Sequence, residues 1–392
     1  MYNDTMYQLG SAPSAIRELF AYGMQRKAEI GEENVFDFSI GNPSVPAPAS
    51  VAEAIRELAD MPPAELHAYS AAQGLESTRQ AIADNLNERF ATSYSADNLY
   101  LTMGAAACLS ACFTALTEPG DEIIVIAPYF PEYRIWIQFA GGVCVEVPAR
   151  EQDFQIDLDA LEAALTEKTK AVVINSPNNP VGTVYTRETL EGLARTLEAA
   201  EKTYGHEIYL ISDEPYRELT YGIEVPWVPA IYHNTLVCYS WSKSLSLPGD
   251  RIGYVLVPDE VDHAREVYLA VCGAGRSLGY ICAPVFFQRI IERCVGEPTN
   301  VEAYALNRKI LTDALDRLGY EYIAPDGAFY LWIRALEPDA QAFSDKAKEH
   351  ELLLVPSDSF GVSGWVRAGY CIDKDTIKRS IPAFEALKAD YA

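Results

Sequence analysis

Residues 239–254 read YSWSKSLSLPGDRIGY and place one lysine, Lys243, among small hydroxyl residues where an apolar strand ends. Residues 235–239 before it are apolar and β-rich, and the next strand begins at once at residue 252. A lysine at a buried strand end loses hydration, which disfavours its charged form and lowers its pKa until the amine can attack a carbonyl. The stretch therefore predicts a lysine that forms Schiff bases.

Two further side chains of this stretch predict a phosphate site beside the lysine. Arg251 follows Lys243 by eight positions and Ser240 precedes it by three, so a tight return brings a fixed cation and a hydroxyl to one phosphate. A lysine that holds an aldehyde next to a phosphate clamp suggests pyridoxal phosphate as cofactor. Within this stretch alone, an ordinary surface lysine in a loop is an equally good interpretation.

The composition bounds the class of protein. A chain of 392 residues, 49% hydrophobic and 22% charged, is typical of a globular protein with a large core and a second lobe. The formal net charge of -25 argues against nucleic acid or an anionic membrane as a partner. The sequence contains no leader pattern and no apolar run long enough to cross a bilayer, so we expect a cytoplasmic protein.

The cysteines and histidines predict neither disulfides nor a metal. The eight cysteines form no CxxC pair and lie mostly in apolar segments, so we expect buried, reduced thiols. None of the five histidines stands at ligand spacing from another histidine or cysteine, and we predict no metal site.

Strands and helices alternate over residues 99–257 and predict an α/β fold. The expected strands are 99–103, 122–127, 143–147, 171–175, 208–212, 236–240 and 252–257. Such alternation means crossover connections and a mostly parallel sheet of seven strands flanked by helices. Ligands of these sheets bind beyond the carboxyl ends of the strands. The residues found there are Gly104, 128–130, 176–180, 213–216, Ser242 and Lys243.

The chain before and after this region has a different pattern. Helices are expected over 14–30, 51–60 and 75–90, with a strand over 36–40. After a long helix over 301–318, short strands near 321–323, 329–333, 352–355 and 365–368 and a last helix over 376–387 predict an α+β lobe. We therefore expect a large domain over residues 46–290 and a smaller one made of 1–45 and 291–392.

Three separated motifs resemble those of the aspartate aminotransferase superfamily, the class I/II aminotransferases of PLP-transferase fold type I. Residues 175–182, NSPNNPVG, are similar to the family's Asn-Pro-x-Asn-Pro-Thr-Gly loop, and residues 213–216, DEPY, to its Asp-x-x-Tyr. Ser240, Lys243 and Arg251 resemble its lysine and phosphate signature. The resemblance extends over nearly the whole chain and implies an enzyme that depends on pyridoxal 5'-phosphate.

The resemblance also implies a role for each matching residue. Lys243 would hold the cofactor, and Asp213 would stay ionised and pair with the ring nitrogen. Tyr216 and Asn179 would hydrogen-bond the phenolic oxygen of the ring, while Phe130 would stack on its face with Tyr133 nearby. The phosphate would be bound by Ser240, Ser242, Arg251 and the backbone amides of Gly104, Ala105 and Ala106.

Further matches concern the substrate and a second subunit. Arg367 matches the arginine that grips the substrate α-carboxylate, assisted by Gly41 and Asn179. Tyr69 resembles a tyrosine that reaches the phosphate of the neighbouring subunit, which implies a homodimer with shared active sites. Some aspartate-specific relatives carry a lysine at the position of Ala106, and here Arg276 is the candidate replacement.

The first functional hypothesis is an aminotransferase that moves an α-amino group between an amino acid and a 2-oxo acid by a ping-pong reaction. Aspartate, alanine and aromatic amino acids are candidate substrates. A carbon–sulfur β-lyase with the same cofactor is the alternative. A non-catalytic regulator is a distant one, because it needs a DNA-binding extension for which the helix beginning near Ser14 leaves no room.

A nicotinamide-dependent dehydrogenase is excluded. Residues 273–279, GAGRSLG, nearly match a dinucleotide fingerprint, but the last glycine comes one position too late. The segment also does not follow a first strand of a βαβ unit with an acidic residue about twenty positions on.

Overall fold

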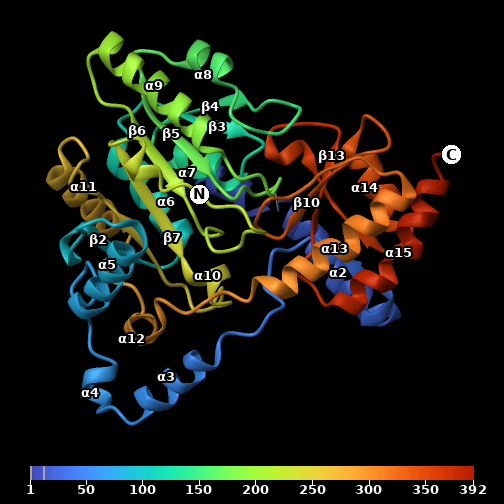
Figure 1. Cartoon of the computed structure of the whole chain (residues 1–392), viewed down its shortest axis with the longest axis horizontal. Coiled ribbons are helices and arrows are strands. Elements are labelled where there is room, and N and C mark those ends of the chain that lie inside the picture. The colour runs from blue at the N-terminus through green and yellow to red at the C-terminus, as the bar shows by residue number, and fades with distance from the viewer. Residues whose placement is uncertain (1, 12–13) are drawn as a thin grey trace.

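The computed structural model describes residues 2–11 and 14–392 as three sheets surrounded by helices (Figure 1). The largest sheet has seven strands in the order β2-β8-β7-β6-β5-β3-β4. Their bounds are β2 Leu99–Thr102, β3 Glu122–Ala127, β4 Val143–Pro148, β5 Thr169–Asn175, β6 Tyr209–Asp213, β7 Thr235–Ser240 and β8 Gly253–Leu256. In this sheet only β8 runs antiparallel to its neighbours. The predicted α/β fold with a mostly parallel seven-stranded sheet is confirmed.

Both faces of the large sheet are covered because its central strands carry buried apolar side chains on both sides. In β3, Ile123 and Val125 pack into a core shared with α6 and α11, whereas Ile124 and Ile126 point the other way, into a core shared with α8 and α9. The helices around the sheet are α5 Glu76–Phe90, α6 Ala105–Leu116, α7 Glu132–Phe139, α8 Leu158–Ala164, α9 Arg187–Tyr204, α10 Trp241–Ser244, α11 Ala264–Ser277 and α12 Val285–Cys294. The buried layers on both sides hold the carboxyl ends of the strands in fixed positions.

The C-terminal lobe contains a four-stranded antiparallel sheet in the order β12-β13-β10-β9. Its strands are β9 Tyr322–Ile323, β10 Tyr330–Arg334, β12 Val355–Pro356 and β13 Trp365–Gly369, and its helices are α13 Val301–Leu318, α14 Ala340–Lys348 and α15 Lys374–Ala389. A short parallel pair, β1 (Phe36–Asp37) with β11 (Leu352–Leu353), connects the N-terminal segment to this lobe. The long α13 runs from the large sheet toward the C-terminal lobe (Figure 1). The exact domain boundaries stay a prediction.

The remaining elements lie in the first hundred residues or are single 3-10 turns. The helices are α1 Asp4–Ser11, α2 Ala15–Ile30, α3 Ala49–Ala59 and α4 Pro63–Leu66, and the 3-10 turns are Glu32–Asn34, Ala96–Asn98, Val228–Ala230 and Ser357–Phe360. α2 begins where it was expected, since the side chain of Ser14 accepts a hydrogen bond from the amide of Arg17.

Two local expectations were wrong, and one helix was not expected. The strand expected over 36–40 ends at Asp37, whose carboxylate accepts hydrogen bonds from the amide and hydroxyl of Ser39 and so turns the chain out of the ladder. The strand expected over 352–355 is two strands, because Leu352–Leu353 pairs with β1 and Val355–Pro356 pairs with β13. α1 was not predicted at all; the side chain of Asn3 caps its first turn.

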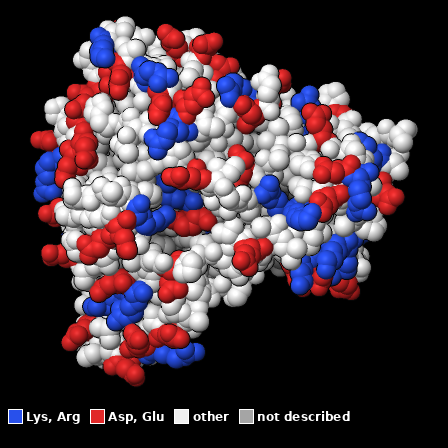
Figure 2. Space-filling model, in the orientation of Figure 1, with Lys and Arg blue, Asp and Glu red and all other residues white. Residues whose placement is uncertain are grey.

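The surface carries charges of both signs. On the face shown in Figure 2, acidic and basic side chains are interspersed, and the described residues of this face form no continuous basic area. Such an area is what the phosphate backbone of a nucleic acid requires. Within the described part of the chain, no helix is long and apolar enough to span a bilayer.

Candidate active site

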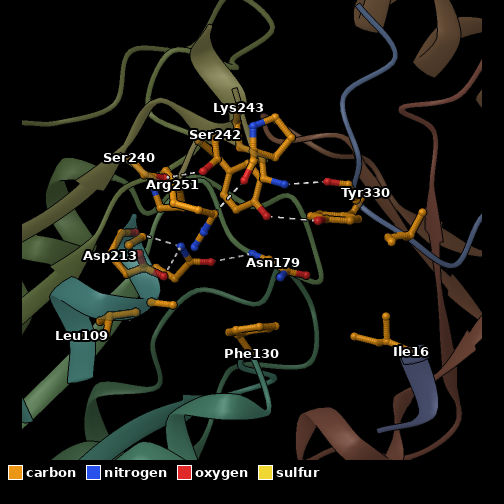
Figure 3. Close-up of a pocket in the computed structure, with 18 of the residues that line it drawn as sticks. Ile16, Leu109, Phe130, Asn179, Asp213, Ser240, Ser242, Lys243, Arg251 and Tyr330 are labelled. Carbon is orange, nitrogen blue, oxygen red and sulfur yellow. Dashed lines mark hydrogen bonds between the residues drawn. The ribbon is translucent and has the colours of Figure 1, made fainter. Parts of the chain in front are cut away.

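A cavity of about 290 Å3 lies beyond the carboxyl ends of β5, β6 and β7, where the large sheet meets the C-terminal lobe. Figure 3 shows it with Lys243, Ser242 and Ser240 on one side and Phe130 and Ile16 across from them. The predicted site residues that line it are Gly41, Ala105, Ala106, Phe130, Asn179, Asp213, Tyr216, Ser240, Ser242, Lys243, Arg251 and Arg367. Segments more than 300 positions apart in the sequence thus contribute to one cavity.

Lys243 lies on the short helix α10, directly after β7, rather than in the loop that one interpretation of the sequence allowed. Its Nζ donates a hydrogen bond to the carbonyl oxygen of Gly41 at 2.5 Å. Burial lowers the pKa of the amine to about 8; the Cys371 thiol opposes this shift, and the charges of Arg367 and Arg251 add to it. A considerable fraction of this lysine is therefore neutral near pH 7 to 8, the form that attacks carbonyls.

Asp213 ends strand β6 and is buried among polar partners. Its Oδ2 accepts a 2.5 Å hydrogen bond from the hydroxyl of Tyr133 and a longer one from the side-chain amide of Asn175. Its Oδ1 is buried and has no hydrogen-bond partner among the described residues. Burial raises the pKa of this carboxyl to about 7, while the bond from Tyr133 lowers it. A cationic N–H placed against Oδ1 would satisfy the oxygen and favour the ionised form.

The predicted phosphate groups converge at the start of α6. The helix begins at Ala105, so the first backbone amides have no acceptor within the helix and the positive end of its dipole faces the cavity. A side chain at Gly104 would meet the guanidinium of Arg251 at 2.8 Å, so only glycine lets the arginine approach this turn. Ser240 and Ser242 lie 3.2 Å apart through their hydroxyl oxygens. Together these groups form an anion site.

Arg367 lies on β13 at the opposite end of the cavity and is only 2% exposed. Its guanidinium donates to Oδ1 of Asn179 at 2.9 Å and to the carbonyl of Ser39 at 2.6 Å. Its Nε is buried without an acceptor, and no carboxylate in the described chain pairs with it. A buried cation without a counter-charge is costly, so the site suits an incoming carboxylate.

These observations fit pyridoxal phosphate. Oδ1 of Asp213 is an unpartnered acceptor where a ring nitrogen is expected, Lys243 presents an amine of lowered pKa, and the α6 terminus forms the anion site. Phe130 lines the same cavity, with its ring edge-on to that of Tyr133 at 5.9 Å. The roles of the individual residues stay predictions.

Gly104, expected at the phosphate, is not itself a lining residue but directly precedes Ala105, which is. Two further residues with an expected role also lie outside the cavity. Tyr69 is 89% exposed in the loop between α4 and α5 and does not touch the cavity of its own chain. Arg276 is exposed in the last turn of α11 and is not among the lining residues. Within one chain, Arg276 therefore does not replace the lysine that is absent at Ala106.

Sequence reasoning missed several lining residues. Ile16, Trp136 and Tyr330 line the cavity, and all three stand in apolar segments that look like ordinary core. Tyr330 is the first residue of the run YLWIR, in which an alternating strand pattern does not distinguish a cavity-facing tyrosine from a packed one. A hint was available only for Trp136, which lies in α7, the helix that begins two residues after the expected aromatic Phe130.

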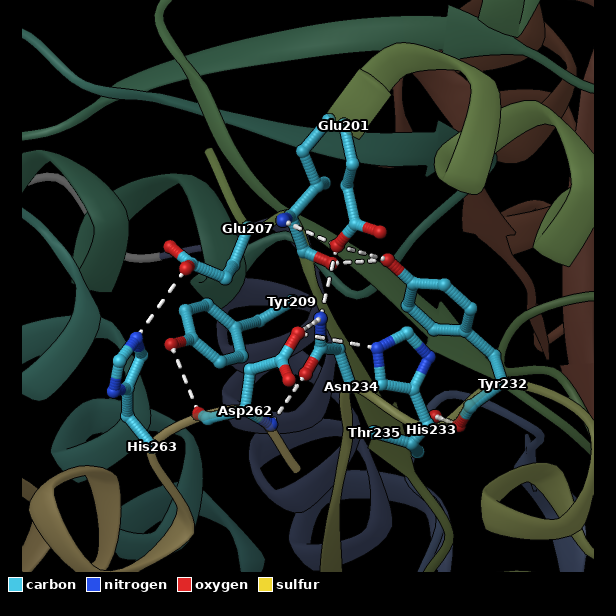
Figure 4. Close-up of polar contacts among 10 residues, drawn as sticks. Glu201, Glu207, Tyr209, Tyr232, His233, Asn234, Thr235, Asp262 and His263 are labelled. Carbon is cyan, nitrogen blue, oxygen red and sulfur yellow. Dashed lines mark hydrogen bonds and ion pairs between the residues drawn. The ribbon is translucent and has the colours of Figure 1, made fainter. Parts of the chain in front are cut away.

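Three of the histidines lie near the amino ends of β6 and β7, and Figure 4 shows two of them, His233 and His263. His233 pairs with Asp262 at 3.2 Å and His263 with Glu207 at 3.4 Å, while His206 contacts backbone carbonyls. Each ring thus has its own partner. Among residues 2–11 and 14–392, no group of three or more His, Cys, Asp or Glu side chains is arranged to hold a metal ion.

Comparisons with known proteins show the family to which the chain belongs. The family model for aminotransferase class I and II matches residues 33–384. An aspartate/prephenate aminotransferase of Thermus thermophilus is 32% identical over 351 residues, which are 88% of this chain and 88% of that protein.

Solved structures are similar over the whole chain. The crystal structure of an amino transferase from Eubacterium rectale is 56% identical, covers 100% of this chain and 99% of its own, and superimposes with a TM-score of 0.97. Aspartate aminotransferase from Thermus thermophilus with maleate is 28% identical, with coverage of 96% and 97% and a TM-score of 0.86. This chain belongs to the class I and II aminotransferases, enzymes that transfer nitrogenous groups with pyridoxal phosphate as cofactor.

Proposed function

We propose that this enzyme moves an α-amino group from an amino acid to a 2-oxo acid in two half-reactions, with Lys243 as the residue that holds the cofactor covalently. One observation carries the proposal: a lysine whose pKa is lowered to about 8, an unpartnered Asp213 oxygen and an unpaired Arg367 line one cavity. These groups match the amine, the ring nitrogen and the α-carboxylate that transamination has to bring together.

When bound, pyridoxal phosphate supplies an aldehyde that condenses with amines and a ring that withdraws electrons from the substrate Cα. Asp213 supports this by presenting its free Oδ1 to the ring nitrogen. Once the substrate amine has displaced it from the cofactor, Lys243 would act as a base through its free Nζ, taking the proton from Cα and delivering it to the former aldehyde carbon of the cofactor. Its lowered pKa suits this role, because proton transfer is most efficient when the pKa of the base lies near the working pH.

Arg367 binds the α-carboxylate and thereby orients Cα toward Lys243. The guanidinium is held in place by Asn179 and by the backbone of Ser39, so little side-chain freedom is lost when the carboxylate arrives. Because it is buried, its charge is poorly screened by water, which strengthens the contact with an anion.

We propose that two chains associate and share their active sites, with Tyr69 reaching the phosphate of the partner's cofactor. The support is the 89% exposure of this large aromatic side chain together with the exposed position of Arg251 at the phosphate end. The exposed tyrosines and Met6 around α1 add apolar surface that a partner could cover. A cytoplasmic location also stays a proposal, supported by the eight free cysteines.

For the substrate, we propose a broad specificity that includes alanine or aromatic amino acids, with aspartate as the alternative. The cations that line the cavity are Lys243, Arg251 and Arg367, and each already has a role. Across from them lie Ile16 and Phe130, with Trp136 packed on Phe130. A side-chain carboxylate at that end would lose hydration without a counter-charge from the described residues of this chain.

The test is a half-reaction screen of the purified, cofactor-loaded enzyme with each common amino acid and no oxo acid. Conversion of the cofactor absorbance to that of its amino form, with release of the 2-oxo acid, is the expected result. Pyruvate and ammonia formed from cystathionine without any oxo acid would indicate the β-lyase instead. Failure of every amino acid to react would overturn the proposal.

The attachment site is tested separately by borohydride reduction and peptide mapping. The cofactor is expected on Lys243, and Lys243→Ala should abolish transamination while the fold is kept. Lys170→Ala, which changes a lysine of strand β5 outside the cavity, is the matched control and should behave like the wild type. A modified peptide containing another lysine would show that the assignment is wrong.

A further inference from the structure

Two buried tyrosines, one from each lobe, meet in the wall of the cavity. Tyr216 follows strand β6 of the large sheet and Tyr330 begins strand β10 of the small one. Their hydroxyl oxygens are 3.0 Å apart, and either can be the donor. Both side chains are buried, and both line the cavity.

Tyr330 also contacts the predicted carboxylate site through its ring. The guanidinium of Arg367 lies over this ring, 4.5 Å from its centroid. β10 and β13 are hydrogen-bonded neighbours, which fixes the two residues relative to one another. A side chain at Gly41 would overlap the Tyr330 hydroxyl, so glycine there leaves room for it. Tyr330 thus touches Arg367 with its ring and Tyr216 with its hydroxyl.

Each tyrosine hydroxyl has a single proton, and this decides which of Tyr216 and Tyr330 is the donor in the hydrogen bond between them. A phenol has one proton to donate and can accept through its lone pairs. The inference rests on the proposed function and on the role that the family resemblance implies for Tyr216, a hydrogen bond to the phenolic oxygen of the cofactor. Because that oxygen is ionised, Tyr216 is the donor in this bond. Tyr216 then has none left for Tyr330, so Tyr330 must be the donor to Tyr216.

The charges around the pair favour this arrangement. The groups facing Tyr330 are Arg367 on β13, Tyr216 and the thiol of Cys371, and Lys243 lies 6.0 Å from the ring centroid of Tyr216. Burial raises the pKa of both phenols and raises that of Cys371 to about 12, so all three stay protonated near neutral pH. The hydroxyl bond is therefore present throughout the working range, next to the guanidinium of Arg367.

We propose that Tyr330 is a positioning residue that links the carboxylate site to the cofactor site. Its ring holds the guanidinium of Arg367, and its hydroxyl donates to Tyr216. A phenol that accepts a hydrogen bond becomes a better donor, since neighbouring bonds in a chain polarise one another. Tyr330 thereby strengthens the bond from Tyr216 to the cofactor without touching the reacting atoms.

The proposal separates the hydroxyl of Tyr330 from its ring, and two variants test the two parts. Tyr330→Phe keeps the ring and removes the proton donor. The spectroscopic pKa of the bound cofactor should rise by about half a unit to one unit, because a weaker Tyr216 donor stabilises the anionic phenolic oxygen less. The dissociation constants of succinate and 4-methylpentanoate, measured calorimetrically on the loaded enzyme, should change by less than about twofold.

Tyr330→Leu removes the ring as well. Both carboxylates should then bind about five- to thirtyfold more weakly, as expected for the loss of a desolvated contact between a cation and an aromatic ring. In the Tyr216→Phe background, Tyr330→Phe should no longer shift the spectroscopic pKa, since its effect passes through the Tyr216 hydroxyl.

Tyr370→Phe is the matched control. It removes a partly buried bond of the same length, 3.0 Å, between Tyr370 and Tyr221, outside the cavity lining. This variant should leave the spectroscopic pKa and both dissociation constants unchanged.

An unchanged spectroscopic pKa in Tyr330→Phe, or an equal shift in the Tyr216→Phe background, would overturn the proposed link. So would a loss of carboxylate affinity in Tyr330→Phe as large as that in Tyr330→Leu. A wild-type enzyme that reacts with no amino acid would instead refute the proposed function, so the two failures are distinguishable.

Discussion

The carboxylate of Asp213 accepts a 2.5 Å hydrogen bond from the hydroxyl of Tyr133 through one oxygen, while its other oxygen is buried without a donor among the described residues. Burial raises the pKa of Asp213 to about 7, and the bond from Tyr133 lowers it. Tyr133 itself stays protonated, since burial beside Asp213 raises its pKa well above the usual value. The neutral phenol of Tyr133 thus favours the negative charge of Asp213, which the cofactor ring needs as a partner for its nitrogen.

The first prediction follows from this pair. Tyr133→Phe removes the bond, so the pKa of Asp213 should rise and more of the carboxyl should be protonated at neutral pH. We expect kcat to fall by about tenfold or more at pH 7 and to recover partly as the pH rises, since higher pH restores the carboxylate. The measurement is kcat from pH 6 to 9. A parallel decrease at every pH would mean that Tyr133 acts only through packing.

The second prediction contrasts the two ends of the cofactor. Arg251→Ala should weaken cofactor binding by about ten- to hundredfold, because a charge-assisted contact to the phosphate is lost in every state of the reaction. Asp213→Asn should reduce kcat more than it reduces cofactor affinity, because the ring-nitrogen charge matters most when Cα becomes negative. Equilibrium dialysis of the cofactor and kcat at saturating cofactor distinguish the two effects. Equal cofactor affinity in Arg251→Ala and the wild type would contradict the phosphate assignment.

The third prediction concerns stability and pH in the cofactor-free protein. The pKa of Lys243 is lowered from 10.5 to about 8, so between these values the unfolded chain binds more protons than the folded one. The buried amine therefore imposes a cost on folding that is absent above pH 10.5, grows as the pH falls and is complete below about pH 8. Lys243→Met removes this cost and should raise the free energy of unfolding at pH 7 by about 1–3 kcal/mol.

Urea unfolding of the cofactor-free wild type and Lys243→Met at pH 7 and at pH 10 measures this difference. The advantage of the variant should shrink at the higher pH. Lys170→Met controls for loss of a lysine elsewhere in the large sheet and should show no pH-dependent gain. A gain of equal size at both pH values would indicate better packing rather than a titrating amine.

The fourth prediction tests the shared active site. Tyr69→Ala and Lys243→Ala should each lower activity at limiting cofactor, the first by weakening phosphate binding in the partner. Mixed and reassembled, the two variants should recover about a quarter of wild-type activity, because half of the random dimers are heterodimers and each contains one intact site. Phe139→Ala, which removes another exposed aromatic side chain, should not lower activity at limiting cofactor. No recovery on mixing would mean that Tyr69 does not act across the interface.

The sequence by itself determined the large sheet and the polar site residues that follow its strands. Strands made mostly of apolar residues alternate with helices over residues 99–257, and that periodicity is a local property of the chain. Lys243, Asp213 and Asn179 were recognisable because polar residues stand directly after buried strands, where parallel topology brings all the strand ends together.

Only the tertiary structure decided which apolar residues face the cavity. Ile16, Trp136 and Tyr330 come from α2, α7 and β10, and in sequence each resembles a core residue of its own element. The tertiary structure also brings the hydroxyl of Tyr133 into a hydrogen bond with Asp213. It leaves Arg276 exposed, outside the cavity in which a cation for the substrate was expected. Local patterns specify which side of an element is buried, but the partner on that side depends on how distant elements pack, and no periodicity along the chain encodes this contact.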